Sequence, residues 1–197
     1  MLLLGGLLAG VGCRSRPARV GPFPPDAVIL AFGDSLTCGV GATESESYPS
    51  VLARLTGLEV INAGVPGEVS TAGMTRIRTA LERHKPALVI LCHGGNDLIQ
   101  GGDEATLIRN LKSMARAIRD GGAKTILIGV PRPGLLLRVP VFYEQIADEF
   151  GLPYDGEVVR GILSSPALKS DMIHPNPDGY RKLAEAVAAM IAPAPAR

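Results

Sequence analysis

The side chains best suited to chemistry in this sequence are one serine, Ser35, and an aspartate–histidine pair, Asp171 and His174. A serine hydroxyl is a weak nucleophile, so it needs a base within hydrogen-bond reach before it can attack a carbonyl carbon. An aspartate three residues before a histidine in a loop can reach the second ring nitrogen, where it fixes the tautomer and stabilises the imidazolium. The three side chains together would suit nucleophilic catalysis with His174 as the general base.

The sequence contains three histidines, which limits the choice of base. His84 closes an amphipathic segment and is expected to be solvated. His93 ends a strongly apolar run and is expected either to line a pocket or to form a local hydrogen bond. The Asp171–His174 pair could also bind a metal, but no third ligand is near it in the sequence, so we favour the catalytic interpretation.

Short apolar runs alternate with amphipathic segments along the chain. Runs of strand type occur at 27–32, 60–63, 87–92 and 125–130, with a short one at 152–154. Segments of helical spacing occur at 48–55, 71–84, 105–119, 141–150 and 177–191, the last with Asn176 as its expected cap. Continuously apolar strands that alternate with helices predict a parallel sheet covered on both faces. Four or five strands are too few for an eight-stranded barrel, so we expect a doubly wound, three-layer α/β sandwich.

In such a sheet, functional residues collect at the carboxyl ends of the strands. Polar blocks follow the first three predicted strands: Gly33-Asp34-Ser35-Leu36, residues 62–68 and His93-Gly94-Gly95-Asn96-Asp97. A fourth block, residues 171–175, lies in the loop before the last helix. These four blocks, in this order over residues 27–191, resemble the GDSL or SGNH hydrolase family, and most of all its bacterial arylesterase, thioesterase and lysophospholipase I branch. The resemblance implies a flavodoxin-like sheet of order 2-1-3-4-5 and chemistry without a cofactor. It also implies Ser35 as nucleophile, Asp171 and His174 as its triad partners, and Gly67 and Asn96 as oxyanion donors.

Physical reasons accompany these oxyanion roles. The backbone N–H of Ser35 opens a strand-to-helix turn, Gly67 has no Cβ to keep its N–H from an oxyanion, and the Asn96 side chain supplies an amide donor. The alternatives are a turn glycine for Gly67 and a capping residue for Asn96. Asp34 and Asp97 are expected to brace their loops by accepting backbone N–H groups.

The segment 132–140 follows the fourth predicted strand and should overhang the site. Its leucines, Leu135, Leu136 and Leu137, could hold an acyl chain or pack against the following helix. The expected activity is that of a serine esterase, hydrolysing (thio)ester bonds of short- to medium-chain acyl substrates such as aryl esters or lysophospholipids through an acyl-enzyme. A carbohydrate O-acetyl esterase of the cell envelope is the alternative. A non-catalytic binding module is a third hypothesis, against which the intact catalytic residues argue.

Composition excludes several other functions. The 20 basic and 19 acidic residues give a net charge of +1, which argues against a general nucleic-acid binder. Gly39-Val40-Gly41 lacks the third glycine of a dinucleotide-binding loop, and the sequence has no Gly-Lys-Ser/Thr, Cys-x-x-Cys or His-Glu-x-x-His pattern, so no metal site is expected. With aromatic residues at 4%, the core must be aliphatic. Cys38 and Cys92 could pair, but we favour two small buried thiols.

The sequence predicts four regions: a signal-like segment at 1–13, a Pro-rich linker at 14–26, the hydrolase domain at 27–192 and a tail at 193–197. The first twelve residues are apolar and too short to span a bilayer, and they resemble the apolar part of a secretory signal. Cys13 follows directly, which suggests a lipoprotein cleavage site and membrane attachment through acylated Cys13. The expected location is the cell envelope, in the periplasm with or without the lipid anchor; the alternative is the cytoplasm.

Overall fold

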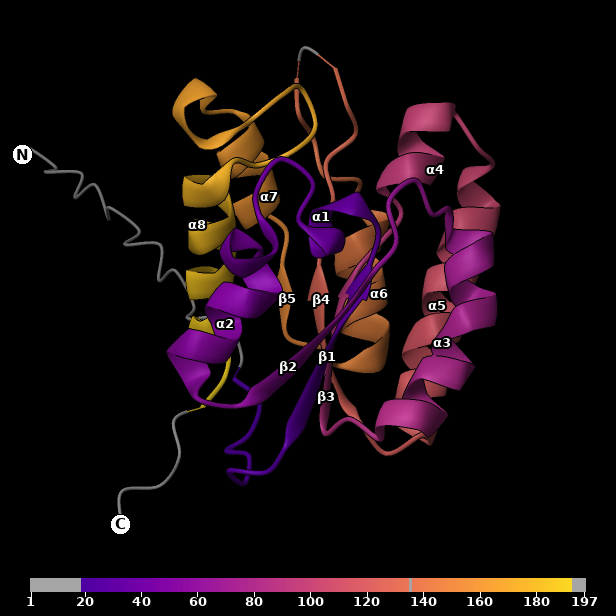
Figure 1. The fold of residues 1–197 in the computed structure, drawn as a ribbon. Helices are drawn as coiled ribbons and strands as arrows, with labels where there is room; N and C mark the ends of the chain where they lie inside the picture. The colour runs from indigo at the N-terminus through magenta and orange to yellow at the C-terminus, as the bar shows by residue number, and fades with distance from the viewer. Residues whose placement is uncertain (1–18, 135, 193–197) are drawn as a thin grey trace, which may run out of the picture.

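The computed structural model describes residues 19–134 and 136–192 of the chain. Its centre is a parallel five-stranded sheet in the order β2-β1-β3-β4-β5 (Figure 1). The strands are β1 (Val28–Gly33), β2 (Glu59–Gly64), β3 (Leu88–Cys92), β4 (Lys124–Ile128) and β5 (Tyr154–Asp155). The predicted order 2-1-3-4-5 is confirmed, and β1 and β3 lie at its centre, side by side.

Helices cover both faces of this sheet, as predicted for a three-layer sandwich. The helices are α1 (Ser35–Cys38), α2 (Tyr48–Thr56), α3 (Ser70–His84), α4 (Gly95–Gln100), α5 (Glu104–Asp120), α6 (Phe142–Phe150), α7 (Val158–Leu163) and α8 (Pro177–Ala189), with the 3₁₀ turns η1 (Glu44–Glu46) and η2 (Pro166–Leu168). Helices α2, α7 and α8 pack together on one face, and α3, α5 and α6 on the other (Figure 1). No helix in the described ranges is both long enough and apolar enough to cross a membrane.

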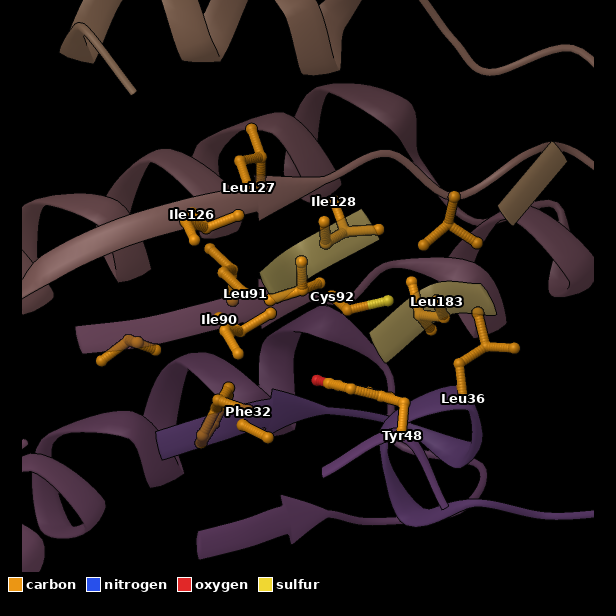
Figure 2. Close-up of a cluster of buried hydrophobic side chains, with 14 of the residues drawn as sticks. Phe32, Leu36, Tyr48, Ile90, Leu91, Cys92, Ile126, Leu127, Ile128 and Leu183 are labelled. Atoms are coloured by element: carbon orange, nitrogen blue, oxygen red, sulfur yellow. The ribbon is translucent and has the colours of Figure 1, made fainter. Parts of the chain in front are cut away.

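The core centres on the adjacent strands β1 and β3. Most of its side chains are aliphatic, but its largest fully buried ones are the aromatic Tyr48, Tyr143, Tyr180 and Phe32, so the expectation of an aliphatic core holds only in part. Every residue of β3 is buried, and so is β1 from Ile29 onward. Figure 2 shows side chains of β1, β3 and β4, among them Phe32, Ile90 and Ile126, meeting in one cluster. A strand that is buried on both faces needs apolar residues at successive positions, which is why the continuous apolar runs in the sequence predict these strands.

Local signals set the ends of the long helices. The Asn176 side chain accepts a hydrogen bond from the Gly179 N–H at 3.0 Å, so Asn176 caps α8 as predicted. Helix α5 ends at Asp120, one residue beyond its predicted end, with Gly121 as its cap, whereas β4 ends at Ile128, two residues before its predicted end. Helices α1, α4 and α7 were not predicted, since helices of one or two turns are too short to show an amphipathic period.

The first described residues pack against the far end of the domain. Val20 forms a parallel bridge with Ile191, its N–H donating to the Met190 carbonyl at 2.9 Å. Phe23 also packs against the core. Part of the predicted linker therefore contacts the last helix, whereas the segment 1–18, with Cys13, and the tail 193–197 lie outside the described residues.

Candidate active site

Ser35, His174 and Asp171 form one chain of hydrogen bonds at the carboxyl edge of the sheet. His174 Nε2 lies 3.0 Å from Ser35 Oγ, and His174 Nδ1 lies 2.7 Å from Asp171 Oδ2. Asp171 Oδ1 accepts the backbone N–H groups of Ile173 and His174, each at 2.8 Å. The fold thus brings the serine within reach of a histidine 139 residues away, with a carboxylate held behind the ring.

The charge on Asp171 follows from its contacts. Partial burial acts to raise the pKa of Asp171, but the hydrogen bonds from the His174 ring and from the backbone of Ile173 and His174 outweigh it and lower that pKa. An ionised Asp171 favours a proton on His174 Nδ1, which leaves Nε2 as an acceptor toward Ser35. The arrangement can therefore take a proton from the Ser35 hydroxyl.

The turn that carries Ser35 is tightly built. A Cβ on Gly33 would lie 2.0 Å from the carbonyl oxygen of Cys92, so only glycine allows β1 and β3 to approach here. Asp34 Oδ1 accepts the Leu36 N–H at 3.1 Å and caps α1, which confirms the predicted bracing role. Asp34 is 1% exposed and Oδ2 has no hydrogen-bond partner among the described residues, so burial raises the pKa of this carboxyl.

Two of the predicted oxyanion donors lie on neighbouring segments, Gly67 in the loop after β2 and Asn96 at the start of α4. Gly67, with a φ of 78°, occupies the third position of a turn from Val65 to Glu68 that is closed by the Glu68 N–H to the Val65 carbonyl at 3.2 Å. Asn96 lies in the first turn of α4 and donates from Nδ2 to the Glu68 carbonyl at 3.1 Å. This hydrogen bond joins the Gly67 turn to the start of α4, and Asn96 and Ser35 line the same pocket.

Asp97 and His93 are both engaged in hydrogen bonds within the protein. Asp97 accepts the Ser70 N–H at 2.8 Å and the Ser70 hydroxyl at 2.6 Å, which confirms that it braces a loop. His93 is fully buried and is absent from the lining of the pocket beside Ser35; it bonds Glu68 Oε2 at 3.0 Å, so the local hydrogen bond is the correct alternative. His84 is the last residue of α3 and half-buried, less solvated than expected.

Glu68 and Arg76 were missed by the sequence reasoning. Arg76 binds both carboxylate oxygens of Glu68, at 2.9 and 2.7 Å. Burial alone would raise the pKa of Glu68, but the hydrogen bonds from His93 and Arg76 and the charge of Arg76 lower it to about 2. One signal was available: Arg76 falls among the buried positions of its helix, between Gly73 and Ala80.

An apolar pocket opens beside Ser35. Its wall consists of Asp34, Ser35, Leu36, Gly95, Asn96, Ile99, Val130, Pro131, Pro133, Leu137, Leu163, Met172 and Ile173. Of the three leucines expected at the substrate, Leu137 lines this pocket, Leu136 is outside the lining and 66% exposed, and Leu135 lies outside the described residues. Leu163 was not foreseen because it comes from the unpredicted helix α7.

The remaining candidate groups are the two cysteines of the domain and possible metal ligands. Cys92 is buried and Cys38 is half-buried, and both are free thiols. In residues 19–134 and 136–192, no three His, Cys, Asp or Glu side chains are grouped so as to hold a metal ion.

Residues 31–182 match the GDSL-like Lipase/Acylhydrolase family. The chain is 35% identical over 137 residues to Esterase TesA of Pseudomonas aeruginosa, covering 67% of this chain and 65% of that protein, which is just under two thirds of its length. It is 26% identical to Thioesterase 1/protease 1/lysophospholipase L1 of Escherichia coli, covering 84% of this chain and 83% of that protein.

Solved structures give the same result. A crystal structure of TesA superposes with a TM-score of 0.73 at 29% identity, covering 81% of this chain and 95% of that chain. The SGNH-hydrolase family esterase AlinE4 superposes with a TM-score of 0.66 at 29% identity, covering 85% and 95%. The family match spans most of the strands and both ends of the Ser35–His174 hydrogen bond, and from it we conclude that this chain belongs to the GDSL-like lipase/acylhydrolase family.

Proposed function

We propose that this protein is a serine esterase that hydrolyses ester and thioester bonds of short- to medium-chain acyl substrates, such as aryl esters or lysophospholipids. The observation that carries the proposal is the hydrogen-bonded series Ser35–His174–Asp171 at the edge of an apolar pocket. The names of its relatives, which include an esterase, a thioesterase/lysophospholipase and an arylesterase, support the same chemistry.

The reaction proceeds through an acyl-enzyme. Ser35 Oγ attacks the acyl carbon while its proton passes to His174 Nε2, and Asp171 stabilises the imidazolium that forms. The oxyanion of the tetrahedral intermediate is bound by the Ser35 and Gly67 N–H groups and by the Asn96 side-chain amide. When the intermediate collapses, His174 returns the proton to the leaving alcohol or thiol. Water then attacks the acyl-enzyme by the same steps and releases the acid and free Ser35.

The acyl group occupies the apolar pocket beside Ser35. Ile99, Val130, Leu137 and Leu163 line its wall, and burying a hydrocarbon chain there removes apolar surface from water. Because each buried methylene contributes about 0.8 kcal/mol, kcat/KM should rise with acyl length until the pocket is full and then fall.

The central experiment replaces Ser35 with alanine. Ser35→Ala should abolish hydrolysis of p-nitrophenyl butyrate, because no nucleophile remains, while far-UV circular dichroism and thermal unfolding stay as in the wild type. Persisting hydrolysis in the folded variant would refute the assignment. A series of acyl esters from acetyl to palmitoyl then separates the two esterase hypotheses, since strict preference for acetate, with release from acetylated sugars, would indicate the carbohydrate esterase instead.

The cell-envelope location is a second part of the proposal. The apolar segment before Cys13 supports export, and a cysteine at its end supports acylation and a lipid anchor there. Fractionation of cells that express the wild type and Cys13→Ala tests this. We expect the wild type in the membrane fraction and Cys13→Ala released from it; a wild type that fractionates as a soluble protein would refute the anchor.

A further inference from the structure

A buried ion network lies under the turn that carries Gly67. Glu68 follows that glycine and is 9% exposed, whereas Val65, Pro66 and Gly67 are all exposed. The Glu68 side chain accepts hydrogen bonds from two groups, the guanidinium of Arg76 and the ring of His93. Glu68 is therefore the buried anchor of an otherwise exposed turn.

Arg76 connects this anchor to the strand that leads to the nucleophile. Its guanidinium lies 4.0 Å from the centroid of the Phe32 ring and donates to the Gly33 carbonyl at 3.4 Å. Phe32 and Gly33 are the last residues of β1, three and two positions before Ser35. One rigid, planar group thus holds Glu68 against the segment that positions the serine.

His93 connects the same carboxylate to the helix that carries Asn96. Its Nδ1 accepts the Gly94 N–H at 2.8 Å, which leaves the ring proton on Nε2, where it donates to Glu68 at 3.0 Å. Gly94 is the cap of α4, and the hydroxyl of Tyr143 donates to the His93 carbonyl at 2.8 Å. The start of α4 is therefore fixed relative to Glu68.

We infer that Glu68 is a positioning residue for the oxyanion hole, held by Arg76 and His93, and that it sets both the Gly67 turn and the direction of the Asn96 amide. The backbone carbonyl of Glu68 accepts the Asn96 Nδ2–H, so a displaced Glu68 moves both donors at once. Oxyanion donors act only when they aim at the developing charge, and an error of 1 Å can cost about 10²-fold in rate. The inference rests on the proposed esterase function.

The first test replaces Glu68 with glutamine, which keeps the shape of the side chain and removes its charge. Glu68 Oε2 accepts from both Arg76 and His93, and Oε1 accepts the Arg76 Nε–H at 2.9 Å. An amide NH2 in place of either oxygen sets a donor against these donors, so at least one of the three hydrogen bonds is lost. We expect kcat for p-nitrophenyl butyrate to fall about 10- to 100-fold, with KM changed less than about twofold, because donors to the transition state are disturbed and the acyl pocket is not. The matched control is Glu149→Gln, which breaks the Glu149–Lys112 pair on the α5–α6 surface at 2.6 Å and should leave both constants unchanged.

A double-mutant cycle separates positioning from a general structural effect. Asn96→Ala removes one of the donors that Glu68 is inferred to aim, so Glu68→Gln should cost clearly less in that background than in the wild type. If the two losses in kcat multiply, Glu68 does not act through Asn96 and the inference is overturned. An unchanged kcat in a folded Glu68→Gln protein overturns it as well.

A steric variant covers the case in which Glu68→Gln fails to fold. A Cβ on Gly73 would lie 2.3 Å from His93 Nε2, so Gly73→Ala pushes the ring from Glu68 while every charge stays in place. We expect a kcat at least about tenfold lower with unchanged KM; an unchanged kcat would overturn the inference. Gly161→Ala is the matched control, since the same methyl on α7 lies within 4 Å of no described residue outside its own helical turn. Failure of the wild type to hydrolyse any ester would instead refute the proposed function itself.

Discussion

At the scale of single residues, two buried carboxyl groups near the active-site edge, those of Asp34 and Glu68, have pKa values that shift in opposite directions. Among the described residues, Asp34 has no positively charged partner in hydrogen-bond contact, and burial raises its pKa. Glu68 is also buried, but the hydrogen bonds from His93 and Arg76 and the charge of Arg76 lower its pKa to about 2. Burial acts to raise the pKa of both carboxyl groups, but it prevails only at Asp34, because Glu68 has Arg76 and His93 as hydrogen-bond donors.

The Glu68 pKa predicts a specific pH dependence of stability. Because the folded pKa is depressed from 4.5 to about 2, the ionised carboxylate stabilises the fold fully above pH 4.5 and this contribution is lost as the pH falls toward 2. The difference in free energy of unfolding between wild type and Glu68→Gln should shrink by about 2 kcal/mol from pH 7 to pH 3. Urea denaturation at both pH values measures it; a difference that stays constant would show that Glu68 titrates normally in the folded protein.

At the scale of elements, the short helices α1 and α4 carry two of the polar groups of the site, Ser35 and Asn96. Helix α1 begins at Ser35, one residue beyond the end of β1, and α4 carries Asn96 shortly after β3. Since β1 and β3 are adjacent and parallel, their carboxyl ends, and the helices that follow them, meet at one edge. The loop after β4 completes the pocket with Leu137.

Leu136 and Leu137 form a natural test pair in that loop. Leu137 lines the pocket, whereas its neighbour Leu136 is 66% exposed and outside the lining. Leu137→Ala should lower kcat/KM for octanoyl esters about tenfold and affect acetyl esters little, because a longer chain loses apolar contact. Leu136→Ala should leave the chain-length profile unchanged. Equal profiles for the two variants, measured with p-nitrophenyl esters, would mean that the acyl chain does not reach Leu137.

At the scale of the whole molecule, the first and last described segments of the chain are hydrogen-bonded to each other at the end of the domain remote from the site. Val20 lies beside Ile191 at the end of α8, and the Ala192 N–H donates to the Val20 carbonyl at 2.7 Å. The first and last described segments are thus joined at the C-terminal end of α8, away from α1, which begins at Ser35 (Figure 1).

Val20→Pro should weaken this closure without affecting catalysis. Proline has no N–H, so the hydrogen bond to the Met190 carbonyl is lost, at a cost of about 1 kcal/mol and a few degrees in Tm. Val20→Ala, which keeps the N–H, is the control for the lost side chain. Differential scanning calorimetry and the p-nitrophenyl butyrate assay check both variants; a Tm no lower than that of Val20→Ala would show that the bridge contributes nothing.

The sequence by itself determined the fold class, the strand order through its family resemblance, and the edge at which the polar blocks gather. These features are local in origin: continuous apolar runs indicate buried parallel strands, and residues that follow such strands share one edge. Glycine and asparagine at turn and cap positions, as at Asn176, fixed the limits of the long helices well. The short helices α1, α4 and α7 could not be predicted because they span too few turns to show a period.

Only the tertiary structure decided which side chains meet. The 3.0 Å contact between Ser35 and His174 joins residues that are 139 positions apart, and the pairing of Glu68 with His93 depends on two loops from different strands. The tertiary structure also buries His93 away from the pocket, where it forms hydrogen bonds within the protein. It places Leu137 in the pocket wall and leaves the neighbouring Leu136 exposed. Residue types and spacing name the candidates for chemistry, but distances and burial are set by packing between elements, which no local pattern encodes.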